Sequence, residues 1–115
     1  MRLIGDGGHA SVVRDVIRRS RFQGNGHAFI AVGSNFARSL EAANNDSLTY
    51  ATLIDPSAVV SPSVRIGAGT IVMAGAVVEA NAVIGRHCIV NHGATVDHDC
   101  QLGDFVHIAP GAHLC

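Results

Sequence analysis

Aliphatic residues recur every six positions along the second half of the chain, from Ile54 to Leu114, without a gap. Small or β-branched residues follow each member four positions later, from Ala58 to Ala112. An amphipathic helix repeats every ~3.6 residues and a half-buried strand every two or so, so neither explains this period. The aliphatic series is Ile54, Val60, Ile66, Val72, Val78, Ile84, Val90, Val96, Leu102, Ile108 and Leu114.

Glycines add a longer period of 18 residues, which is three hexads. The simplest object with both periods is a triangular prism, with one hexad on each side and one coil every 18 residues. We expect a parallel β-helix whose coils stack at roughly 4.8 Å, and glycines that supply the corner torsions. Cys88 and Cys100 fall in the small series, which predicts core positions for both. The glycine series are Gly67, Gly85, Gly103 and Gly75, Gly93, Gly111.

The first half alternates strand and helix patterns instead. RLI (2–4) and HAFIAVG (27–33) are apolar strand segments, and HASVVRDVIRRSRF (9–22) has apolar residues at helical spacing. FARSLEAA (36–43) follows Ser34 and Asn35, either of which can cap a helix. A further strand is expected near LTYATLI (48–54). We therefore expect a mainly β protein: a reduced Rossmann-like α/β domain with parallel strands at 1–52, then the β-helix at 53–115.

Composition and charge exclude several classes of function. The net charge of −1 and pI near 6.6 offer no electrostatic footprint for nucleic acid. No apolar run approaches the ~20 residues of a membrane span, and the N-terminus does not have the pattern of a signal peptide. Three cysteines, an odd number, give no disulfide framework. These features predict a cytoplasmic protein that binds neither nucleic acid nor membrane.

The stretch VDHDC (96–100) contains the strongest candidate for chemistry. His98 occupies an outward slot next to a corner, between Asp97 and Asp99. A carboxylate beside an imidazole fixes its tautomer and stabilises its charged form, which makes the other ring nitrogen a competent general base. His92 is expected on a different side of the prism from His98. Three further histidines are expected to be solvated: His27, His87 and His113.

Three segments resemble those of a known family. HDCQLGDFVHIAPGAHL (98–114) resembles the segment that carries the catalytic histidine in sugar acetyltransferases of the hexapeptide-repeat family. The branch includes sialic acid O-acetyltransferases and UDP-amino-sugar N-acetyltransferases. IGDGGHASVVRDVI (4–17) and IAVGSNFAR (30–38) resemble two N-terminal elements of the same branch. The resemblance implies a left-handed β-helix, a homotrimer with active sites in the clefts between subunits, and acetyl-CoA as cosubstrate.

The resemblance also implies roles for single residues. His98 would be the base that deprotonates an amine or hydroxyl of a sugar or nucleotide sugar, and Asp99 would orient it. The acetyl-CoA thioester would lie near His107, in a cleft lined by Asn91. The loop that meets the sugar nucleotide would contain Gly5, Gly7, Gly8 and His9. Glycines that open onto a helix N-terminus let backbone N–H groups approach a diphosphate.

Two departures from the family leave a second interpretation open. The N-terminal domain passes almost directly from its first helix to the strand at 27–33, so we expect part of the nucleotide pocket to be missing. The residue stacked on His98 would be number 116, so the family's usual C-terminal coils are expected to be missing as well. The alternative is therefore a catalytically incomplete remnant that acts as a trimeric scaffold or binding module, its open end covered by a partner.

A zinc enzyme is a further alternative, because γ-class carbonic anhydrases share this β-helix and bind zinc through histidines. His87, His92 and His98 lie close together in the sequence, but the position where another ligand is needed holds Ala51. We therefore expect no metal site.

Overall fold

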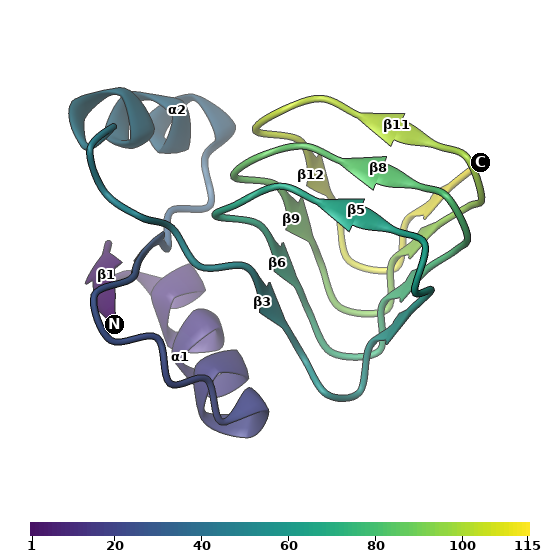
Figure 1. The fold of residues 1–115 in the computed structure, drawn as a ribbon, viewed down its shortest axis with the longest axis horizontal. Coiled ribbons are helices and arrows are strands. Elements are labelled where there is room, and N and C mark those ends of the chain that lie inside the picture. The colour runs from purple at the N-terminus through teal and green to yellow at the C-terminus, as the bar shows by residue number, and fades with distance from the viewer.

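The computed structural model describes residues 1–115, in which a small α/β unit precedes a three-sided parallel β-helix (Figure 1). The α/β unit contains β1 (Arg2–Ile4), α1 (Gly8–Ser20), β2 (Ala28–Ile30) and α2 (Asn35–Asn44). β1 and β2 pair in parallel, as predicted, and an isolated bridge joins Ala28 to Tyr50. The strand predicted at 48–54 is therefore divided between this bridge and the first strand of the β-helix.

Both helices begin and bury residues as their sequences predict. α1 ends at Arg21, whose left-handed φ of 55° lets its N–H donate to the carbonyl of Arg18. α2 begins after Ser34, whose hydroxyl accepts a hydrogen bond from the N–H of Ala37 at 3.2 Å. The apolar face of α1 is completely buried at Ala10, Val13 and Val16.

Eleven two-residue strands form the β-helix. They lie on three sides, and each pairing joins residues 18 apart, as Ile71 and Ile89 are. The β3–β12 side contains β3 (Leu53–Ile54), β6 (Ile71–Val72), β9 (Ile89–Val90) and β12 (His107–Ile108). The β4–β13 side contains β4 (Val59–Val60), β7 (Val77–Val78), β10 (Thr95–Val96) and β13 (His113–Leu114). The β5–β11 side contains β5 (Arg65–Ile66), β8 (Val83–Ile84) and β11 (Gln101–Leu102). The predicted parallel β-helix is confirmed.

The two sequence series fill the interior of the prism. They form one core cluster, which is best buried in its middle coils and half-buried towards both ends. Cys88 is buried and Cys100 half-buried within this cluster, so both predicted core positions are confirmed. The fully or nearly buried members are Val72, Ala76, Val78, Ala82, Ile84, Cys88, Val90, Ala94, Val96 and Ile108.

Only one of the two glycine series supplies corner torsions. Gly75, Gly93 and Gly111 have φ of 66–70°, in the left-handed region, as predicted. The series containing Gly67 and Gly85 has no positive φ, so the prediction is wrong for it. A Cβ atom on Gly67 would instead lie 2.6 Å from the backbone of Gly85 in the next coil. This second series is small because the coils approach closely there.

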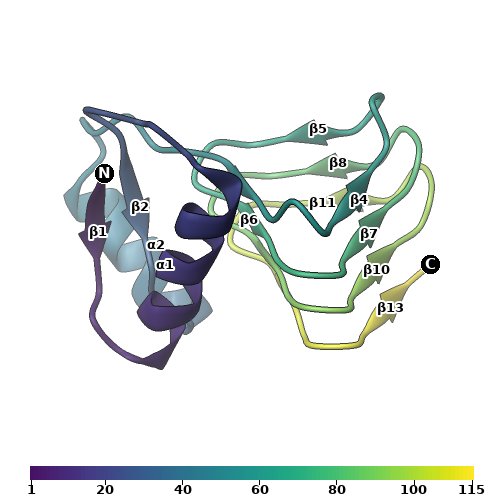
Figure 2. The same cartoon turned by 90° about the horizontal axis from the view of Figure 1, so that it is seen from below.

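The α/β unit packs on the outside of the β3–β12 side, which faces the helices in Figures 1 and 2. Leu53, Ile71 and Ile89 belong to this side and share a second core cluster with the buried face of α1. Burying one such side chain contributes about 1.5–3 kcal/mol, so this contact holds the two parts of the chain together. No helix of the structure is both long and apolar enough to cross a bilayer.

Candidate functional site

His98 and Asp99 lie at the corner between β10 and β11. His98 Nδ1 and Asp99 Oδ2 are 2.8 Å apart, and the backbone N–H of His98 donates to Asp97 Oδ1 at 2.9 Å. The His98 side chain is 69% exposed, so its other ring nitrogen faces outward. The hydrogen bond from Asp99, followed by the charges of Asp97 and Asp99, raises the pKa of His98. The ring is therefore held in one orientation and is more basic than an ordinary imidazole.

The local sequence explains why this ring points outward. Val96 and Cys100 take the interior positions on either side of the corner, which leaves no inward slot for His98. Asp99 has a φ of 62°, and aspartate is one of the few residue types that adopt this left-handed conformation readily. Its N–H donates to the carbonyl of Ala80 in the preceding coil at 3.0 Å. The corner therefore fixes the carboxylate that fixes the imidazole.

Asn91 and His107 meet on the outer surface of the β3–β12 side. Asn91 Nδ2 lies 3.0 Å from His107 Nε2, and Asn91 Oδ1 accepts the N–H of His92 at 2.8 Å. This second bond orients the amide so that its NH₂ group donates to Nε2, which places the proton of a neutral His107 on Nδ1. Burial, and then the charge of Arg38, lowers the pKa of His107. His107 is therefore a neutral, oriented imidazole.

His9 belongs to the same region of the molecule. It lies in the first turn of α1, and its Nε2 is buried without a hydrogen-bond partner. Burial lowers the pKa of His9, and the nearby charges of Arg38 and His107 lower it further. The structure thus brings His9, Asn91 and His107 together, while it places His98 and Asp99 at a different corner of the prism.

The glycines before His9 have two different structural reasons. Gly5 has a φ of 113°, and a Cβ atom there would lie 2.6 Å from the carbonyl oxygen of Ala31. Gly7 and Gly8 border open space, since a Cβ on either would meet nothing within 4 Å. The first N–H groups of α1 lack intrahelical partners, and no acidic side chain occupies its first turn. This helix end is open to an anionic ligand.

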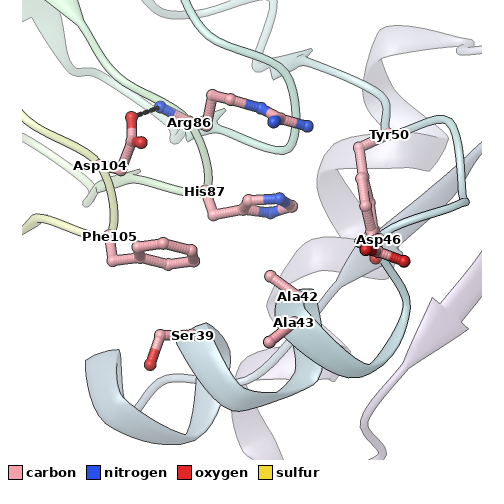
Figure 3. Close-up of a pocket in the computed structure, with 9 residues that line it drawn as sticks. All are labelled: Ser39, Ala42, Ala43, Asp46, Tyr50, Arg86, His87, Asp104 and Phe105. Carbon is pink, nitrogen blue, oxygen red and sulfur yellow. Dashed lines mark hydrogen bonds between the residues drawn. The ribbon is translucent and has the colours of Figure 1, made fainter.

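His87 is not solvated, and the prediction for this residue is wrong. It is 3% exposed and lies between Tyr50 and Phe105, with ring centroids 4.5 Å and 5.4 Å away (Figure 3). The reason is its left-handed φ of 54° at a corner, which turns the ring towards the α/β unit. The ring lines a cavity of about 290 Å³ between α2 and two coils.

The other histidines differ in their surroundings. His92 and His113 are exposed, as expected, although His113 Nδ1 bonds the hydroxyl of Thr95 at 2.7 Å. His27 is half-buried against the edge of Phe22 and has an unpartnered Nδ1, so the prediction of a solvated residue is wrong. Within the chain, no three His, Cys, Asp or Glu side chains are grouped to hold a metal ion.

Sequence reasoning missed Arg38, the buried guanidinium that influences His9 and His107. Its segment IAVGSNFAR was noticed only as a motif. The available signal was an arginine on the apolar side of α2, three residues after a helix cap.

Comparisons with known proteins agree on one group of relatives. The family described as bacterial transferase hexapeptide (six repeats) matches residues 81–115. The acetyltransferase domain of PglB from Neisseria gonorrhoeae FA1090 is 38% identical, with a TM-score of 0.91 over 99% of this chain and 72% of that one. The same domain has been solved in complex with acetyl coenzyme A. No curated protein matches the chain.

A second relative is PerB from Caulobacter crescentus, solved with CoA and GDP-perosamine. It is 33% identical, with a TM-score of 0.91 over 96% of this chain and 69% of that one. A histidine-to-asparagine mutant of perosamine N-acetyltransferase from the same organism, also with CoA and GDP-perosamine, is 34% identical with a TM-score of 0.90.

Proposed function

The chain belongs to the hexapeptide-repeat family of sugar acetyltransferases, and from this premise we propose that it transfers the acetyl group of acetyl-CoA to the amine of a nucleotide-linked amino sugar, with His98 as general base. The observation that carries the proposal is the 2.8 Å contact between His98 and Asp99. It occupies Nδ1 with a carboxylate and leaves Nε2 free and outward.

The chemistry requires a base at the moment of attack. As the acceptor nitrogen forms its bond to the thioester carbonyl carbon, it must lose a proton, and the free Nε2 of His98 accepts it. The carbon–sulfur bond then breaks, and CoA leaves as its thiol. The raised pKa of His98 makes the ring a stronger proton acceptor, and Asp99 stabilises the imidazolium that forms.

Two ligands are assigned to the second cluster. Acetyl-CoA would place its thioester near His107 and Asn91, and the nucleotide part of the acceptor would lie at the glycine loop before His9. The open N-terminus of α1 suits a diphosphate. Relatives that bind acetyl-CoA, CoA and GDP-perosamine support both assignments.

These two half-sites lie at different corners of one chain, so we propose that a second copy completes the site. The β4–β13 side runs from the corner of Asn91 to the corner of His98. If three copies turned this side towards a common axis, His98 of each would approach the Asn91 corner of the next. The outer surface of this side contains Val59, which is 63% exposed, and the half-buried Val77 in register with it. A trimer would cover these valines.

The test is acetyl transfer to a nucleotide-linked amino sugar, followed by the release of the CoA thiol. We expect His98→Ala to lower turnover by ~10²–10⁴-fold, the usual contribution of a positioned base. Gln101→Ala, at an exposed residue beyond the same corner, is the matched control and should keep its activity. Unchanged turnover in His98→Ala would exclude His98 as the base.

Thermal unfolding with acetyl-CoA separates the proposal from the scaffold alternative. A melting temperature that rises with acetyl-CoA concentration is expected, because a ligand that binds the folded state stabilises it by mass action. A melting temperature that does not respond favours the scaffold.

A further inference from the structure

Arg38 is a completely buried residue of α2, with 1% of its surface exposed. Its guanidinium makes five hydrogen bonds, which can occupy all of its N–H donors. Nε donates to the carbonyl of His87 at 2.7 Å, and Nη2 donates to the carbonyl of Phe105 at 3.0 Å. The remaining bonds are to the carbonyls of Val32 and Gly33, both at 3.1 Å, and to Asn35 Oδ1 at 2.6 Å.

None of these partners carries a negative charge. The salt bridges of the chain do not include Arg38. Burial lowers the pKa of Arg38, but a guanidinium stays protonated in proteins. A buried charge without a counter-charge is costly and rare, so a fold that keeps one needs a reason beyond filling space.

The bonds of Arg38 join three parts of the chain. Val32 and Gly33 lie in the loop between β2 and α2, whereas His87 and Phe105 occupy the same corner of two successive coils. The β2–α2 loop in turn contacts His9, because a Cβ atom on Gly33 would lie 3.9 Å from the Cβ of His9. Arg38 therefore connects the loop beside His9 directly to the β-helix that carries His107.

The charge of Arg38 acts on the same residues. It lowers the pKa of His9 and of His107, in each case adding to the effect of burial. It also acts on two groups at the adjoining corner: it lowers the pKa of His87 and opposes the rise that burial causes in Cys88. Arg86 and Asp104 are the other charged groups that act on His87, and Figure 3 shows them beside its ring.

We infer that Arg38 is a positioning residue for the proposed acetyl transfer: it fastens the α/β unit to two coils so that His9 is held beside His107. The inference rests on the proposed function, because these two histidines are assigned to the acceptor and to acetyl-CoA. Its charge keeps both rings neutral, which leaves each with one nitrogen able to accept a hydrogen bond from a ligand.

Three variants separate the bonds of Arg38 from its charge. Arg38→Met removes both, Arg38→Lys keeps the charge but not the five-bond geometry, and Asn35→Ala removes one acceptor only. Arg14→Met, at an exposed position of α1, is the control. The readouts are the imidazole pKa values of His9 and His107 by NMR titration, and kcat and KM for acetyl transfer.

Arg38→Met should raise both imidazole pKa values, whereas Arg38→Lys should leave them low. Both variants should raise the acceptor KM by ~10–100-fold, since a misplacement of about 1 Å costs that much, and Asn35→Ala should have a smaller effect in the same direction. If Arg38→Met does not fold, Arg38→Lys and Asn35→Ala decide. A wild-type KM in both of these variants, or unchanged imidazole pKa values in a folded Arg38→Met, overturns the inference. If the wild-type chain transfers no acetyl group, the proposed function fails, while the NMR titration still tests Arg38.

Discussion

Protonation of His87 should loosen the junction between the α/β unit and the β-helix. The ring lies between Tyr50 and Phe105 and is 3% exposed. Burial, and then the charges of Arg86 and Arg38, lowers the pKa of His87 to about 4, although Asp104 opposes the shift. The folded protein therefore holds this imidazole in its neutral form.

The size of the effect follows from linkage between protonation and folding. Above pH 6.5 the ring is neutral in both the folded and the unfolded chain, and its contribution to stability is fully present. Between pH 6.5 and about 4 only the unfolded chain binds the proton, so stability falls as the pH falls. At 1.36 kcal/mol per pKa unit the total loss is about 3 kcal/mol.

Urea unfolding of the wild type and of His87→Gln measures this loss. The free energy of unfolding is compared at neutral pH, near pH 6.5 and near pH 4. The variant is expected to be less stable at neutral pH, because it loses ring packing, but the difference between the two proteins should shrink by about 3 kcal/mol towards pH 4. Other titrating groups contribute equally to both proteins and cancel. A difference that stays constant with pH would refute the reasoning.

Three further outcomes can be measured. Asp99→Asn removes the acceptor that raises the pKa of His98, so the acid limb of the pH profile of kcat/KM should move to lower pH and the maximum should fall; an unmoved limb would argue against the pair. Thr70→Val leaves the carbonyl of Gly85 and the N–H of Cys88 without their bonds at 2.8 Å and 2.9 Å, and should cost about 2–4 kcal/mol in urea unfolding; a loss near zero would mean that these groups find other partners. Val59→Asp places a charge on the proposed trimer surface and should yield monomers in sedimentation, whereas an unchanged mass would place the interface elsewhere.

The interior of the prism could be predicted from the sequence because it obeys a strict rule. Each side has one aliphatic and one small inward position, so a single wrong residue would have broken the series at Ile84 or Ala94. The outward positions obey no such rule. Ile71 and Ile89 look like strand residues in general, and only the docked helix α1 explains why they are apolar.

The site was predicted unevenly for the same reason. His98 and Asp99 are neighbours in the sequence, so their contact is local and could be expected. The group of His9, Asn91 and His107 depends on how the α/β unit sits on the prism, which no local pattern encodes. The environment of His87 depends on a left-handed corner residue, and histidine is not the residue type that would normally suggest one.

The coil of 18 residues, confirmed by every strand pairing, limits how such a chain can change in length. An insertion of one hexad would keep every inward residue inward but turn all later residues onto the next side, which would carry His98 away from its corner. An insertion of a whole coil would preserve both the interior and the compass direction of each side chain. Insertions and deletions in this scaffold are therefore quantised: core packing tolerates steps of six, but a working groove tolerates only steps of 18.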